Sequence, residues 1–213
     1  MDPDPLLERL DTPVLGLNVA FHWPLPEAFR GEYDRLRARL QALDPGVYVY
    51  PFEQTHVTVA TIVSFKRHER PDSDEERRIL SLVPPLASRL DTIAAGIDAF
   101  TIDVGAPVLV PSAAFLSITN PTGEVATIRQ RLRDDAALEA ELQIPRAIHS
   151  TILRFRRAPA DPPSFASAFS EMAQSVRFGT ARVEELLVTT ETRAYMMAGR
   201  IVHQTHLKIP PHR

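Results

Sequence analysis

The chain has 213 residues, of which 44% are hydrophobic and 24% charged, a balance typical of globular proteins and not of disordered or fibrous ones. Its formal charge of −3 provides no broad basic surface, which argues against tight binding to a long nucleic acid but leaves nucleotides and short oligonucleotides as partners. Cysteine is absent, which excludes disulfides, thiol nucleophiles and cysteine-based zinc sites.

The beginning of the chain, Met1-Asp2-Pro3-Asp4-Pro5, is acidic and proline-rich and does not resemble a signal peptide. No stretch reaches the ~20 apolar residues that a membrane-spanning helix needs. We therefore expect a cytoplasmic protein without membrane contact, and we expect a monomer.

The first half of the chain predicts a strand, a helix and further strands. An apolar run at residues 14–21 predicts a buried strand, and an amphipathic pattern of three- and four-residue steps predicts a helix at about 27–43. Two β-rich runs follow at 47–52 and 55–65. The polar stretch 66–78 predicts an exposed loop that leads into a helix ending near residue 96.

The second half repeats this layout. Residues 113–119 predict a strand, and the next helix starts with Asn120 as cap and Pro121 at its first position and runs to about residue 142. Residues 148–155 predict another strand, and 163–176 a helix. Two long strands, at about 183–193 and 195–209, close the chain.

Each half thus consists of a strand, a helix and then a strand that carries a His-x-Thr segment. This repeat of layout predicts an α+β fold in which residues 1–213 form a single domain of two lobes related by a pseudo-twofold axis. The strands that carry the two segments should then face each other across a cleft.

The two segments are His56-Val57-Thr58-Val59 and His149-Ser150-Thr151-Ile152. Alternate side chains of a strand share a face, so each histidine and its threonine should point into the cleft together. Histidine can give or take a proton near neutral pH, and a threonine hydroxyl can donate a hydrogen bond to a phosphate oxygen. Together they would supply a base, an acid and two hydroxyl donors around one phosphorus, which suffices to cleave a phosphodiester without a metal.

A third His-x-Thr segment begins at His203. Its fourth position is His206 instead of an aliphatic residue, and no helix unit of its own precedes it. We therefore assign the site to His56 and His149 and place His203 outside it.

The paired segments resemble the signature of the 2H phosphoesterase superfamily, which includes 2′-5′ RNA ligase-like proteins and cyclic phosphodiesterases. The second copy is the closer match, and Arg154 stands where many RNA ligase-like members carry an arginine; Thr61 stands where an aromatic or basic residue is common. The opening at residues 17–26 is also similar to the family's first strand and the start of its helix. The resemblance implies two lobes of mainly antiparallel sheet, with helices outside and a central cleft.

Several other side chains are candidates for substrate binding. Trp23, Tyr50 and Phe52 could stack on a base, although an aromatic beside a strand is more often part of the core. Arg154 could contact phosphate, but simple alternation places it on the strand face opposite His149 unless a bulge intervenes. The charged run 66–70 could guide an anionic substrate or could be an ordinary solvated loop, and His22 could line the cleft or lie at the surface.

We predict a metal-independent phosphodiesterase that acts on a 2′,3′-cyclic phosphate or a short oligonucleotide. The sequence contains no metal-ligand cluster and no glycine-rich phosphate loop, so we expect neither a metal nor another cofactor. Which histidine is the base and which the acid stays open. One alternative is a nucleotide-binding or sensing module without turnover, and another is an interaction protein in which the two histidines lie far apart.

Overall fold

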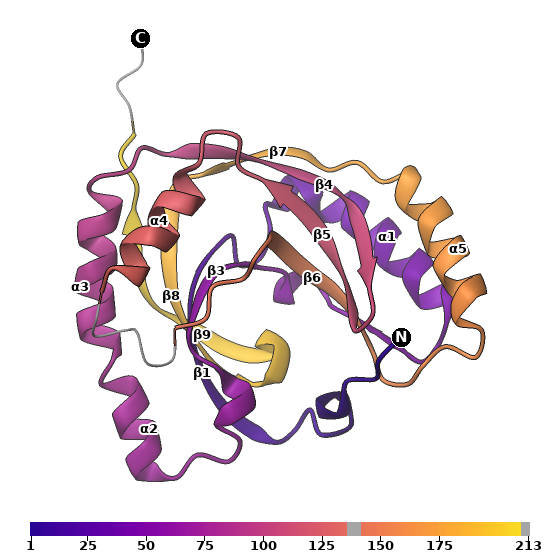
Figure 1. Ribbon diagram of the computed structural model, residues 1–213, viewed down its shortest axis with the longest axis horizontal. Helices are drawn as coiled ribbons and strands as arrows, with labels where there is room; N and C mark the ends of the chain where they lie inside the picture. Colours follow the sequence, from indigo (N-terminus) through magenta and orange to yellow (C-terminus); the bar gives the residue numbers. More distant parts are fainter. Residues whose placement is uncertain (136–141, 210–213) are drawn as a thin grey trace.

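The computed structural model describes residues 1–135 and 142–209, and within them the strands form two antiparallel sheets (Figure 1). The first sheet has the strand order β3-β1-β8-β9, with β1 at Pro13–Phe21, β3 at Val57–Val63, β8 at Glu185–Arg193 and β9 at Ala198–His206. The second has the order β2-β6-β5-β4-β7, with β2 at Val47–Val49, β4 at Phe100–Val110, β5 at Ala113–Thr119, β6 at Ile148–Phe155 and β7 at Gly179–Val183.

The two sheets have equivalent strand orders. In the first, β3 pairs with β1 and β1 with β8; in the second, β6 pairs with β5 and β5 with β4. Each strand with a His-x-Thr segment therefore lies beside the strand that opens its half of the chain. The predicted α+β fold with two related lobes of antiparallel sheet is confirmed.

Helices cover the sheets from outside, and the helix that follows each opening strand crosses to the other lobe. The helix after β1, α1 (Arg30–Leu43), lies beside α5 (Pro162–Gln174) against the second sheet (Figure 1). The helix after β5, α4 (Glu124–Arg133), contacts β3 of the first sheet, which α3 (Val83–Ala94) also covers. The lobes are thus interlocked by the path of the chain.

The apolar pattern of each element explains its place. Strand β1 lies between two other strands and under helices, and every residue from Val14 to Phe21 is buried. Helix α1 buries Tyr33, Leu36 and Leu40, which recur at three- and four-residue steps. A continuous core joins both sheets, with Phe21 of β1 in edge contact with Phe100 of β4 at 6.1 Å between ring centroids. Each such fully buried side chain contributes about 1.5–3 kcal/mol.

Several predicted boundaries were wrong. The helix expected to end near residue 96 is two helices, α2 (Ser73–Leu80) and α3, and strand β4 was not anticipated. Gly105 and Pro107 interrupt the apolar alternation of β4, whose pairing with β5 shifts register between Val104 and Pro107. The strand predicted at 183–193 is β8, and residue 183 ends the separate strand β7.

The other differences lie at turns. Strand β2 ends at Val49, and Phe52 begins a 3-10 turn that interrupts the predicted strand 47–52. Helix α4 starts at Glu124 after Gly123, whose φ of 86° requires the left-handed conformation, while the Asn120 side chain accepts the Val125 N–H at 2.9 Å. Its predicted end near residue 142 involves residues 136–141, which lie outside the described part of the chain.

The strand predicted at 195–209 starts only at Ala198. A 3-10 turn at Ala194–Met196 precedes it, in which Tyr195 and Met196 both have positive φ. Among the described residues, no helix is long and apolar enough to cross a membrane.

Candidate active site

The two His-x-Thr segments meet at one pocket of about 300 Å³ between the sheets. His56 and Thr58 line it from the first sheet, and His149 and Thr151 from the second. The side chains that alternate with them, Val57, Val59, Ser150 and Ile152, are fully buried and do not line the pocket. The predicted orientation of both segments and the predicted cleft between them are thus confirmed.

Both segment strands contain a β-bulge directly after the threonine. Along β1, Ala20 faces Thr58 but Val19 faces Ala60; along β5, Phe115 faces Thr151 but Ala114 faces Leu153. Each bulge turns two successive residues toward the core and returns the fifth residue after the histidine to the pocket. These residues are Thr61 in the first lobe and Arg154 in the second, and both line the pocket. The expectation from simple alternation, that Arg154 faces away from His149, was therefore wrong.

Each imidazole is oriented by the backbone carbonyl two residues before it. The Nδ1 of His56 lies 2.8 Å from the Gln54 oxygen, and the Nδ1 of His149 lies 3.3 Å from the Ala147 oxygen. A carbonyl oxygen only accepts, so Nδ1 carries the proton in both rings. Nε2 is then the nitrogen that can exchange a proton with a substrate.

The surroundings lower the pKa of both histidines. Burial is the main cause for each, and the pKa of His56 is lowered further by the charge of Arg154 and, when it is protonated, that of His149. For His149, burial acts together with the charges of Arg129 and Arg154, and the Phe115 ring lies 5.0 Å from its imidazole. The lowered pKa values favour the neutral form of both rings, with Nε2 in its basic form.

Arg129 connects the two segment strands. This residue of α4 is 7% exposed, and its Nε donates to the Val59 oxygen at 3.0 Å in the bulge of β3. Its Nη2 donates to the Ala147 oxygen at 3.3 Å, the same carbonyl that accepts from His149. A single guanidinium therefore holds the backbone next to both candidate catalytic groups.

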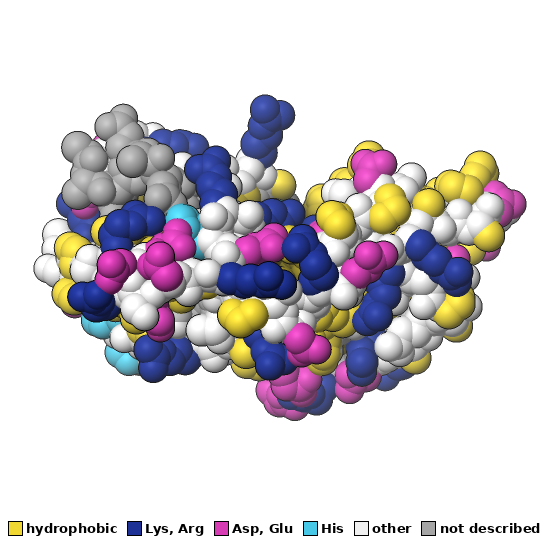
Figure 2. All heavy atoms as spheres, turned by 90° about the horizontal axis from the view of Figure 1, so that it is seen from below, with side chains coloured by type: hydrophobic (Ala, Val, Ile, Leu, Met, Phe, Trp, Pro, Cys, Tyr) yellow, Lys and Arg dark blue, Asp and Glu magenta, His cyan; other side chains and the backbone are white. Residues whose placement is uncertain are grey.

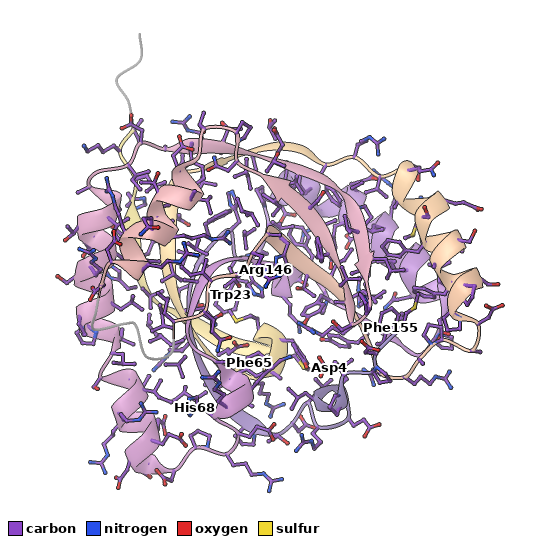
Figure 3. All side chains as sticks on the ribbon, viewed as in Figure 1. Asp4, Trp23, Phe65, His68, Arg146 and Phe155 are labelled. Carbon is purple, nitrogen blue, oxygen red and sulfur yellow. The ribbon has the colours of Figure 1, made fainter. Side chains whose placement is uncertain are left out.

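Arg154 is held at one wall of the pocket by three contacts. Its Nε donates to the Tyr50 hydroxyl at 3.0 Å, its Nη1 pairs with Asp4 at 3.1 Å, and its guanidinium lies 4.7 Å from the Tyr195 ring centroid. Asp4 lies next to Phe155 at the end of β6 (Figure 3), and the Phe155 carbonyl accepts its N–H at 2.8 Å. The start of the chain thus orients a cation beside His149.

The other predicted binding residues are divided between pocket and core. Tyr50 lines the pocket, whereas Phe52 packs in the core with its ring 5.6 Å from that of Tyr33. The Trp23 indole donates to the Glu53 carbonyl at 3.1 Å and does not line the pocket. Tyr50 is therefore the one of the three aromatic candidates that the described structure brings to the site.

Three further histidines, His203, His22 and His68, do not line the pocket. His203 pairs with Asp91 of α3 at 2.7 Å, outside the pocket as predicted. His22 has a φ of 50° and is half-buried, and burial lowers its pKa to about 4. In the charged run 66–70, Lys66 lines the pocket, whereas His68 is buried and contacts Glu75 at 2.5 Å.

Sequence reasoning missed two polar residues of the pocket floor, Asn18 of β1 and Glu191 of β8. Both are buried, at 6% and 4% exposed, and the Asn18 amide donates to the Glu191 carboxyl at 3.2 Å. The signal was present, because each is a polar residue within a run whose neighbours are mostly apolar or threonine.

On the face shown in Figure 2, Lys and Arg side chains alternate with Asp and Glu, in keeping with the formal charge of −3. Within the residues that the structure describes, no group of three or more His, Asp or Glu side chains is arranged to hold a metal ion.

No protein-family model matches the sequence, and no curated protein matches it. Solved structures do share its fold. The protein TT0787 of Thermus thermophilus is 16% identical, with a TM-score of 0.61 over 92% of this chain and 99% of that chain. Escherichia coli LigT in complex with 3′-AMP is 20% identical, with a TM-score of 0.59 over 92% and 99%. A structure described as a phosphoesterase is also 20% identical, with a TM-score of 0.58 over 91% and 98%. The chain thus has the fold of LigT, in agreement with the resemblance seen in its paired His-x-Thr segments.

Proposed function

We propose that the chain is a phosphodiesterase of the 2H phosphoesterase superfamily that hydrolyses a 2′,3′-cyclic phosphate or a short oligonucleotide. The observation that carries this proposal is the convergence of His56, Thr58, His149 and Thr151 on one pocket. The equivalent Nδ1 contacts, which leave Nε2 of both rings for proton transfer, support it.

The reaction requires one proton to be removed and one to be supplied. With a 2′,3′-cyclic phosphate bound, the neutral Nε2 of one histidine takes a proton from water as the water oxygen bonds to phosphorus. The bond from phosphorus to one ribose oxygen breaks, and that oxygen takes the proton of the other imidazole. The hydroxyls of Thr58 and Thr151 donate to the nonbridging oxygens, on which negative charge increases.

A lowered pKa favours the neutral form of a histidine, which can act as the base. The histidine that acts as the acid must instead take up a proton when the substrate binds. An anionic phosphate favours the charged imidazole, so substrate raises the pKa of the histidine that acts as acid. A bell-shaped dependence of rate on pH follows, with macroscopic pKa values that belong to the pair.

Nucleotides are the ligand class that the neighbouring structures favour. LigT has been solved with 3′-AMP, with ATP and with NADP+. In the chain described here, Phe65 and Tyr195 line the same pocket as the histidines, with ring centroids 5.5 Å apart, and offer an aromatic surface to a base.

The proposal is tested with purified protein and a panel of the four nucleoside 2′,3′-cyclic phosphates and short 2′-5′ and 3′-5′ oligonucleotides, with EDTA present. We expect turnover of at least one substrate, because imidazoles and hydroxyls supply acid, base and charge stabilisation without a metal. The double variant His56→Ala/His149→Ala should be inactive, and His203→Ala, outside the pocket, should match the wild type. Tight nucleotide binding without product would instead identify a sensing module, and loss of activity in EDTA restored by a divalent ion would contradict the metal-free reaction.

A further inference from the structure

Besides the groups of the two His-x-Thr segments, the pocket is lined by Asn18 of β1 and Glu191 of β8. Along β1, Ala20 faces Thr58, Asn18 lies two residues away, and Gly16 faces Glu191. The backbone positions of Thr58 and Glu191, which both line the pocket, are thus offset by four residues of strand, roughly 13 Å. An extended purine nucleotide spans such a length, so a phosphate at the histidines would bring its base to the neighbourhood of Glu191.

The fold encloses the Glu191 carboxyl closely. One carboxyl oxygen accepts from the Asn18 amide at 3.2 Å, and the other accepts from the Met196 N–H at 3.1 Å. Met196 and Tyr195 reach this position in a left-handed conformation, with φ of 57° and 60°, which costs free energy in residues other than glycine. Gly16 provides the space, since a Cβ there would lie 2.8 Å from the Glu191 side chain.

This end of the pocket presents hydrogen-bond acceptors beside aromatic rings. Both donors to Glu191 are neutral, so a carboxylate keeps further acceptor capacity on each oxygen. Asn18 also lines the pocket, and because its amide nitrogen donates to Glu191, its side chain retains a carbonyl oxygen as a second acceptor. Tyr195 adjoins Met196 and, with Phe65, forms the aromatic surface defined above.

We propose that Glu191 is a specificity-determining residue that reads the donor edge of a guanine base. This inference rests on the proposed function, since a phosphate bound between the two histidines fixes where along the pocket the base lies. Guanine presents a ring N–H and an exocyclic amino group side by side, which matches a carboxylate and an adjacent amide oxygen. Adenine and cytosine present the amino group alone, and the N–H of uracil lies between two carbonyl oxygens that the acceptors repel.

The test compares kcat/KM for the guanosine, adenosine, cytidine and uridine 2′,3′-cyclic phosphates at pH 8, for the wild type and for Glu191→Gln. We expect the wild type to prefer guanosine over adenosine by roughly 10–100-fold, the effect of one to two hydrogen bonds to a charged group. In Glu191→Gln the guanosine-to-adenosine ratio should fall to about threefold or less. Glu184→Gln, at an exposed position outside the pocket, should keep the wild-type ratio.

A wild type without guanosine preference, or a preference that Glu191→Gln leaves unchanged, overturns the inference. Thermal unfolding of both variants separates loss of recognition from loss of folding. If none of the four substrates is hydrolysed, the proposed function fails on its own. In that case the dissociation constants of 3′-GMP and 3′-AMP are measured for the wild type, Glu191→Gln and Glu184→Gln. The ratio of the two constants then decides the role of Glu191.

Discussion

The two lobes place their histidines in the same way but surround them differently. In each lobe the ring is oriented by the carbonyl two residues earlier, and a bulge after the threonine returns the fifth residue to the pocket. That residue is the neutral Thr61 in the first lobe and the cation Arg154 in the second, and the first sheet adds the buried carboxyl of Glu191. We propose that the shared part binds a phosphate that both lobes contact, and that the differing part accommodates the rest of a substrate that is not symmetric.

The largest expected effect comes from removing either histidine alone. His56→Ala and His149→Ala should each lower kcat about 10²–10⁴-fold, because each removes one proton-transfer partner. The variants should differ in their pH profiles: loss of the base removes the rise on the acidic side, and loss of the acid removes the fall on the alkaline side. Steady-state rates between about pH 5 and pH 9 assign the roles, and full activity in either variant would contradict the two-histidine mechanism.

The next largest effect is expected on the free energy of unfolding when Arg129, which links the two lobes, is replaced. Arg129→Met leaves buried carbonyls of both segment strands without their donor, which should destabilise the fold by about 3 kcal/mol. Urea unfolding followed by circular dichroism measures this change. Arg133→Met, at an exposed position of the same helix, should change the free energy of unfolding by less than about 0.5 kcal/mol. Equal stabilities of the two variants would show that Arg129 does not brace the site.

The buried carboxyl of the first sheet predicts a pH dependence of stability. Burial raises the pKa of Glu191 to about 7 from an ordinary value of 4.5. The folded state therefore holds this proton more tightly than the unfolded state, and stability is lost as pH rises from about 4.5 through about 7. Glu191→Gln does not titrate, so its stability relative to the wild type should increase by on the order of 2–3 kcal/mol between pH 5 and pH 8. A difference independent of pH would show that the carboxyl is not enclosed.

The smallest expected effect is a change in KM when Lys66 at the edge of the pocket is replaced. Lys66 is exposed, lines the pocket near Arg154, and belongs to the turn that follows β3. Lys66→Ala should raise KM for a cyclic nucleotide about two- to fivefold with little change in kcat, because an exposed cation attracts the substrate without touching the reacting atoms. The effect should disappear at high salt, and Arg67→Ala, whose residue does not line the pocket, provides the control.

The His-x-Thr segments and most of the strands could be predicted because they depend on local patterns. The apolar runs that became β1, β5 and β6 lie within one residue of the expected ranges, and alternation correctly placed Thr58 and Thr151 on the pocket face. These features follow from the period of a strand and from which side chains avoid water, so neighbouring residues suffice to specify them.

Other parts of the site depend on contacts between distant residues. A bulge exists only relative to a partner strand, so the face of Arg154 could not follow from its own segment. The pairing of Asn18 with Glu191 joins residues 173 positions apart, and the link from Arg129 to Val59 spans 70. The sequence by itself determined the acid, the base and the phosphate donors that we propose. The tertiary structure decided which charges surround them, because only folding brings β1, β3, β6 and β8 to one pocket and α4 against β3.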